Sequence, residues 1–244
     1  MESTAYVDMS STPVPPRAPS PDDVPIRGLL AGLEALIREP RRVMVQLSGP
    51  RAGALVRNMF IAAALCYLFY GVVAGTYARG TQLWAAPVKI AGGLVFSALI
   101  CLPSLYIFAC LAGVRARLVE VAGLVAGLTA ILALLLVGFA PVALVFSTST
   151  DSLPAMGALH IVFGLVAYFF GARFLSAGFT HFKAVSRAGL KFWMILFLLV
   201  ALQMTTALRP IIGTSDTILP KEKKFFLVHW TDCVKEAVDK ETVK

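Results

Sequence analysis

Few residues in this sequence have both the type and the surroundings that chemistry requires. His160, Arg173 and Gln203 lie in or beside strongly apolar runs. A polar or ionisable side chain at membrane depth marks a transport pathway, a proton relay or a contact between helices. No acidic residue lies in these runs to pair with them, and a structural alternative stands for each: Arg173 reaches the headgroups, His160 lies near the outer surface, and Gln203 hydrogen-bonds a neighbouring helix. Both interpretations stay open.

Catalytic and metal chemistry have little support. His229 and Cys233 are spaced to reach one metal ion, with Asp232 nearby, but two ligands are too few for a closed site. No cysteine pair has the C-x-x-C spacing, and no nucleophile elbow, zinc-protease motif, phosphate-binding loop or dinucleotide fingerprint occurs. We predict no catalytic residues, no metal, no cofactor and no enzymatic activity.

The elements that hold these residues follow from the distribution of charge. Hydrophobic residues make up 58% of the 244 and charged residues 15%, against about 45–50% and about 25% in a typical soluble domain. A membrane crossing needs about 20 apolar residues. Five runs contain no Asp, Glu, Lys or Arg: 58–78, 90–114, 121–150, 152–172 and 192–208. We predict an all-α polytopic membrane protein, with five transmembrane helices in a bundle over residues 58–208.

The third run is the longest, but halves of 15 residues are too short for two ordinary crossings. Pro103 and Pro141 each remove a backbone donor within a run, which predicts kinks there. Gly71-x-x-x-Gly75 and Gly123-x-x-x-Gly127 each place two small residues on one helical face, where backbones approach closely. These glycines pack either inside the bundle or against a second copy.

The residues before the first run divide into two parts. Residues 1–25 contain six prolines among serines and threonines, which predicts a disordered tail. Its acidic residues are unlike a cleaved signal peptide, so the first run is a retained span. Residues 26–57 begin with an amphipathic helix that ends before Pro40, beside Arg38, Arg41 and Arg42. This Arg-rich helix lies either flat on the headgroups or against the protein's own cytoplasmic loops.

Residues 209–244 form a C-terminal tail with a second amphipathic segment. Pro210 and Gly213 end the last span, and Phe226 and Trp230 then fall on one helical face. Aromatic side chains favour the membrane interface, so this segment is an interfacial or partner-binding candidate, as are Arg38, Arg41 and Arg42.

Basic residues set the expected orientation. Seven Lys and Arg precede the first run, which favours a cytoplasmic N-terminus. Membrane flanks of this kind account for the net charge of +8 without a nucleic-acid partner. Five spans place the C-terminal tail on the opposite side, and an even number would place it with the N-terminus. The Ala-, Gly- and Arg-rich composition favours a bacterial inner membrane.

The layout resembles the Yip family of multispanning membrane proteins. The similarity lies in the proline-rich N-terminal segment, the amphipathic residues 33–42 with Arg38-Glu39-Pro40-Arg41-Arg42, and five closely set spans. Pro87-Val88-Lys89-Ile90 and the run 113–131 look like bacterial members. The similarity covers about residues 26–208 and implies this architecture. The short tyrosine- and glycine-bearing motifs of eukaryotic members are absent, so it leaves function open.

These observations favour a non-enzymatic integral membrane protein that acts as a scaffold, or as an assembly or trafficking partner of other membrane proteins. Its expected partners are membrane lipids and other membrane proteins or a second copy of itself. The alternative is a small-solute or ion permease or channel that uses His160, Arg173 and Gln203. Coupled transporters normally carry charged groups or broken helices at mid-depth, and this sequence has few such groups.

Overall fold

Seven helices make up the described part of the chain. The structure is a computed structural model, and it describes residues 24–78, 82–149 and 153–207. No strand occurs within these residues, so the predicted all-α fold is confirmed. The helices are α1 (Leu29–Arg38), α2 (Pro40–Leu47), α3 (Ala52–Ala78), α4 (Gln82–Leu111), α5 (Leu118–Ser149), α6 (Leu153–His181) and α7 (Ala188–Ala207).

Four of these helices, α3 to α6, are long and apolar enough to cross a membrane. They identify the chain as an integral membrane protein. The apolar stretch of α7, Ala188–Met204, is shorter. The predicted count of five crossings therefore stays a prediction, with α7 as the fifth helix.

The long helices extend beyond the charge-free runs of the sequence. α3 begins at Ala52 and α4 at Gln82, so Arg57 and Lys89 lie inside helices. At about 1.5 Å per residue these helices are roughly 40–48 Å long, against about 30 Å for the hydrocarbon core. A charge-free run shows only the part of a helix that lies in lipid, so it is shorter than the helix, which continues for further turns beyond the hydrocarbon core. Lys89, which the sequence places at the start of a span, is a buried residue within α4.

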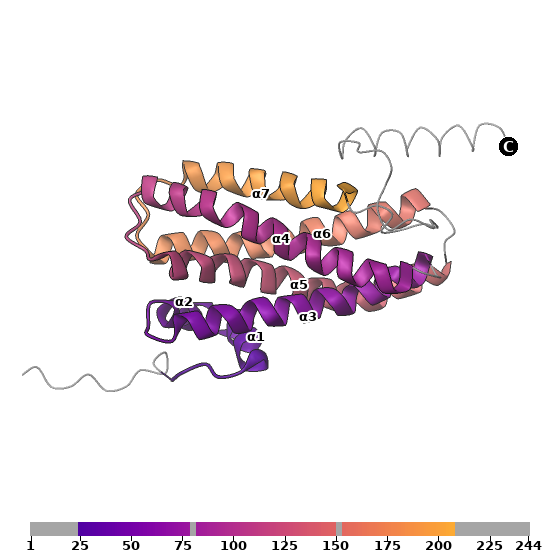
Figure 1. The fold of residues 1–244 in the computed structure, drawn as a ribbon, viewed down its shortest axis with the longest axis horizontal. Coiled ribbons are helices and arrows are strands. Elements are labelled where there is room, and N and C mark those ends of the chain that lie inside the picture. The colour runs from indigo at the N-terminus through magenta and orange to yellow at the C-terminus, as the bar shows by residue number, and fades with distance from the viewer. Residues whose placement is uncertain (1–23, 79–81, 150–152, 208–244) are drawn as a thin grey trace, which may run out of the picture.

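The central helix of the bundle is α5, which packs against α3, α4 and α6. Every residue from 123 to 130 is buried, so this part of α5 is surrounded by protein on all sides. The helix is continuous from Leu118 to Ser149, as expected for a single long crossing. In Figure 1, α5 runs between α3 and α6, and α7 lies along α4, with which it makes most of its contacts.

Glycines permit the closest approaches between these helices. A Cβ atom added at Gly71 of α3 would overlap with the Cα atom of Pro87 in α4. One added at Gly127 of α5 would overlap with the ring of Phe174 in α6. One added at Gly123 would overlap with the Leu47 side chain of α2. Gly71 and Gly127 make their close contacts between helices of the bundle, and Gly123 makes its close contact with α2. Gly75, on the same face as Gly71, is buried.

Hydrogen bonds from aromatic side chains add to this packing. Trp193 Nε1 on α7 donates to the Cys101 carbonyl at 2.9 Å and to Ser104 Oγ at 3.1 Å, both on α4. Tyr67 on α3 donates its hydroxyl to the Thr129 carbonyl of α5 at 2.9 Å. Such bonds satisfy polar groups that have no water to bind at this depth. They hold α7 on α4 and α3 on α5 in fixed register.

Candidate functional site

One end of the bundle carries most of the charge. We name it the hairpin end: α3, α5 and α7 begin there, α4 and α6 end there, and α1 and α2 lie beside α3 (Figure 1). The opposite end is the far end. Among the described residues, Lys89 is the one Lys or Arg in the half of the bundle next to the far end. The described acidic residues, Glu34, Glu39 and Glu120, all lie at the hairpin end. The described basic residues of the hairpin end are Arg27, Arg38, Arg41, Arg42, Arg51, Arg57, Arg115, Arg117, Arg173, Lys183, Arg187 and Lys191.

Two short helices form a helical hairpin at this end. α1 ends at Arg38, where the sequence predicts the end of the amphipathic helix. α2 begins at Pro40, whose ring suits the first position of a helix. Only one helix is expected from the sequence in residues 26–57, so α2 is a second helix that was not predicted. Val43, Met44 and Leu47 recur at helical spacing after the proline, and this pattern indicates the second helix.

The inner face of the hairpin packs on the bundle. α1 buries Gly32, Ala35 and Leu36, and α2 buries three residues that include Leu47, which is fully buried over Gly123 of α5. Full burial of a Leu side chain is worth about 1.5–3 kcal/mol. Both helices contact α3 and α5, so the inner face rests on helices of the bundle. The hairpin is therefore a fixed part of the fold.

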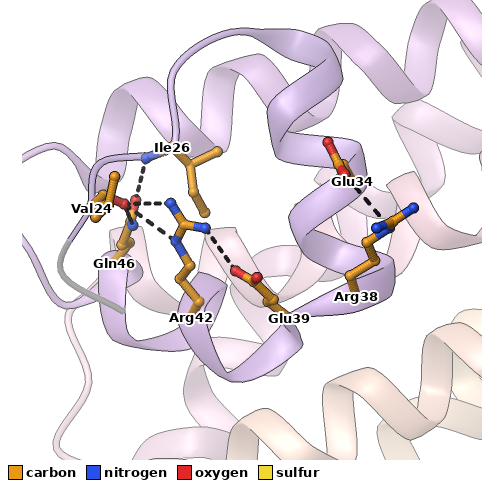
Figure 2. A network of polar contacts seen from close by, with 7 residues as sticks. All are labelled: Val24, Ile26, Glu34, Arg38, Glu39, Arg42 and Gln46. Carbon is orange, nitrogen blue, oxygen red and sulfur yellow. Dashed lines mark hydrogen bonds and ion pairs between the residues drawn. The ribbon is translucent and has the colours of Figure 1, made fainter. Parts of the chain in front are cut away.

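A polar network holds the entering chain to α2, as Figure 2 shows. The Val24 carbonyl accepts hydrogen bonds from Arg42 Nη2 at 2.8 Å and from Gln46 Nε2 at 2.5 Å. The Ile26 N–H donates to Gln46 Oε1 at 2.8 Å, and Arg42 Nη1 pairs with Glu39 Oε2 at 2.7 Å. Arg42 is a partner-binding candidate in the sequence, but here its guanidinium serves the hairpin itself.

Arg38 and Arg41 occupy the α1–α2 corner, which we define as residues 38–42. Both side chains are exposed. Arg38 pairs with Glu34 at 3.5 Å, and because both side chains are largely in solvent the pair contributes little to stability. Arg41 makes no ion pair with any described residue. The corner therefore presents positive charge on a rigid support.

A second set of contacts joins the end of α2 to the start of α5. Glu120 Oε2 accepts the backbone N–H of Arg117 at 2.7 Å, which caps the first turn of α5. Arg117 Nη2 donates to the Ser48 carbonyl at 3.0 Å. Glu120 three residues after the N-cap, before an apolar run, is the half of a capping box that the sequence contains. The hydrogen bond between Arg117 and the Ser48 carbonyl ties the hairpin to the central helix α5.

Within the bundle, His160 of α6 meets Tyr70 of α3. The Tyr70 hydroxyl and His160 Nδ1 are 2.5 Å apart, and the two rings meet edge to face at 5.6 Å. His160 Nε2 is buried and has no hydrogen-bond partner among the described residues. At about 1.5 Å per residue, both side chains lie roughly 10–12 Å from the far ends of their helices. Tyr70 is not among the candidates from the sequence, because one Tyr in an apolar run does not reveal its partner.

The three polar candidates of the sequence do not form one site. Arg173 is on α6, 13 residues or roughly 20 Å from His160. It is exposed, and its guanidinium lies 5.9 Å from the centre of the Phe169 ring. This position near the hairpin end suits a side chain that reaches the headgroups. Gln203 is partly buried on α7 and has an interaction partner.

Other candidates lie outside the described residues: Phe226, Trp230 and the His229–Cys233 pair. Within the described ranges, no group of three or more His, Cys, Asp and Glu residues is placed to hold a metal ion. Comparisons with models of protein families, with curated proteins and with solved structures found no match.

Proposed function

We propose that this protein is a membrane scaffold that brings other membrane proteins together through its α1–α2 corner. The proposal includes the Yip-like layout, five crossings, a bacterial inner membrane and a cytoplasmic hairpin end. Arg38 and Arg41 are the recognition residues, and an acidic segment on the cytoplasmic side of a membrane protein is the complementary partner. Recognition of this kind needs no catalytic group.

The observation that supports this proposal is the rigid support of the corner. Leu47 is buried over Gly123, Arg42 and Gln46 hold the entering chain, and Arg117 holds the Ser48 carbonyl. A preorganised surface binds without first losing conformational freedom, which increases affinity. Exposed arginines on a fixed support suit recognition of carboxylates.

The distribution of charge supports the proposed orientation. Basic residues gather at the hairpin end, whereas Lys89 is the one described Lys or Arg in the far half. Loops rich in Lys and Arg stay on the cytoplasmic side of bacterial membranes.

Charge reversal at the corner tests the scaffold. Arg38→Glu/Arg41→Glu is compared with Lys183→Glu/Arg187→Glu, which makes the same change at exposed positions of the α6–α7 connection. Each full-length variant is affinity-purified from native membranes, and the proteins that travel with it are quantified. We expect the corner variant to lose its co-purifying membrane proteins about tenfold or more, since buried charge pairs at interfaces cost 2 kcal/mol or more when broken. The control should keep them. Equal recovery with both variants contradicts the proposal.

A permease is the second candidate, and the buried His160 Nε2 without a described partner favours it. An ionisable group inside a membrane bundle is a marker of a transport pathway. His160→Phe removes both ring nitrogens and keeps an aromatic ring beside Tyr70. Uptake of small solutes and protons into vesicles that contain the purified protein is the measurement. The permease is supported if the unaltered protein takes up solute and His160→Phe abolishes this uptake. If neither protein takes up solute, the permease is contradicted.

A further inference from the structure

The surface of α1 divides into three sectors. At about 3.6 residues per turn, Gly32, Ala35 and Leu36 form the sector that is buried against the bundle. Next around the helix come Leu33, which is partly buried, and the exposed Ile37 and Leu30. Glu34 and Arg38 follow, both exposed, and complete the turn.

The middle sector is an exposed apolar surface that no other residue of the described part of the chain covers. Leu30 is 81% exposed and Ile37 is 64% exposed. Two large aliphatic side chains one above the other on a short helix are unfavourable in water, where their burial would be worth about 1.5–3 kcal/mol each. The inner sector already holds α1 on the protein, so these side chains serve a different contact.

The position of α1 determines which environment this sector meets. α1 packs directly on α3, and packed helices lie about 8–10 Å apart. α3 itself has an exposed apolar face that includes Ile61, Leu65 and Phe69, as expected for a helix that borders lipid. The lipid that surrounds α3 therefore lies within one helix diameter of α1.

The depth of α1 agrees with this environment. The long helices exceed the hydrocarbon core by roughly 10–18 Å, so their last turns lie in the headgroup layer. Figure 1 shows α1 and α2 beside the first part of α3, at the hairpin end. The exposed Arg27 and Arg38 flank the apolar sector, and their positive charges are attracted to anionic headgroups. Arg38 also neutralises Glu34, the acidic residue of α1.

We infer that the sector Leu30, Leu33 and Ile37 is a phospholipid-binding surface: it inserts into the headgroup and upper acyl-chain layer of the membrane beside α3. α1 then contacts the bundle on one side, lipid on the next and water on the third. This contact fixes the height of the α1–α2 corner above the membrane. The inference rests on the bundle crossing a membrane, and it does not depend on the scaffold role.

Site-specific photo-crosslinking tests the lipid contact. Two full-length variants are made: one carries a benzophenone amino acid in place of Ile37, and the other in place of Leu30. Both keep the natural cysteines. Matched controls carry the benzophenone amino acid at Glu34, on the charged sector of the same helix, and at Leu65, on the exposed face of α3. Each protein is placed in vesicles of phosphatidylcholine and phosphatidylglycerol, irradiated, and weighed intact by mass spectrometry.

We expect lipid adducts at positions 30 and 37 at about the yield of position 65. Their yield should exceed that of position 34, which lies roughly 40–60° further around the helix on the charged sector. Adducts at 30 and 37 no more frequent than at 34 would overturn the inference. So would a protein adduct in place of lipid at these positions in native membranes. Because the vesicles contain no partner protein, failure here is distinct from failure of the scaffold proposal, which the corner variant reports.

Discussion

The contact between Gly71 and Pro87 leads to a sharp prediction about the bundle. A methyl group added at Gly71 would overlap with the Cα atom of Pro87 and lie 3.0 Å from its nitrogen and 3.2 Å from its Cβ. These are backbone and ring atoms, which no rotation of a side chain can move away. Gly71→Ala is therefore expected to push α3 and α4 apart.

Overpacking of this kind costs about 1–3 kcal/mol. For a chain of this size each kcal/mol lowers the melting temperature by about 2–4 °C, so Gly71→Ala should lower it by roughly 2–12 °C. The matched control is Gly92→Ala in α4, where an added Cβ atom meets nothing within 4 Å. Its melting temperature should stay unchanged or rise, because Ala is the better helix former.

Thermal unfolding of the purified protein in detergent micelles, followed by circular dichroism, is the measurement. Both variants keep the same net charge and nearly the same volume, so detergent affects them alike. If Gly71→Ala melts at the same temperature as the unaltered protein, the close packing of α3 on α4 is wrong.

Three further predictions concern the hairpin, α7 and the tail. Arg42→Ala removes the guanidinium that holds the Val24 carbonyl. Loss of this hydrogen bond should destabilise the local structure by about 1 kcal/mol and so raise protease cleavage at residues 24–28 roughly fivefold. The control Arg41→Ala should leave the cleavage rate unchanged. Trp193→Phe keeps an aromatic ring but removes the indole N–H that binds the Cys101 carbonyl and Ser104 Oγ. The change should lower stability by about 1 kcal/mol or more, and unchanged unfolding would contradict these bonds. With five spans and a cytoplasmic N-terminus, a membrane-impermeant thiol reagent should label Cys233 from the outside, and labelling from the cytoplasm alone would rule out five spans.

Composition and charge pattern were enough to predict the all-α fold and the positions of the long helices. A bilayer has a fixed thickness and tolerates few charges, so charge-free runs of about 20 residues reveal the helices directly. The same signal misplaced the helix ends. Arg57 and Lys89 fit inside helices that continue past the hydrocarbon, so a charge does not mark a boundary.

The candidate surfaces were only partly predictable. The amphipathic pattern before Pro40 indicated α1, but periodicity alone does not reveal that one face packs on α3 and α5 while another stays exposed. Tyr70 lies 90 residues from His160 in the sequence, and no local pattern connects them. The network around Val24 depends on backbone carbonyls, whose orientation no side-chain pattern specifies.

The most direct test of the scaffold places a photo-crosslinking amino acid at Arg41, at the α1–α2 corner, in cells that make the full-length protein. Irradiation of intact cells followed by denaturing gel analysis reports which molecule touches this position. We expect a discrete protein adduct that is weaker when Arg38 is also changed to Glu. A crosslinker at position 65 serves as the lipid control in the same experiment. If position 65 captures lipid while position 41 gives only lipid adducts or none, the scaffold role is contradicted.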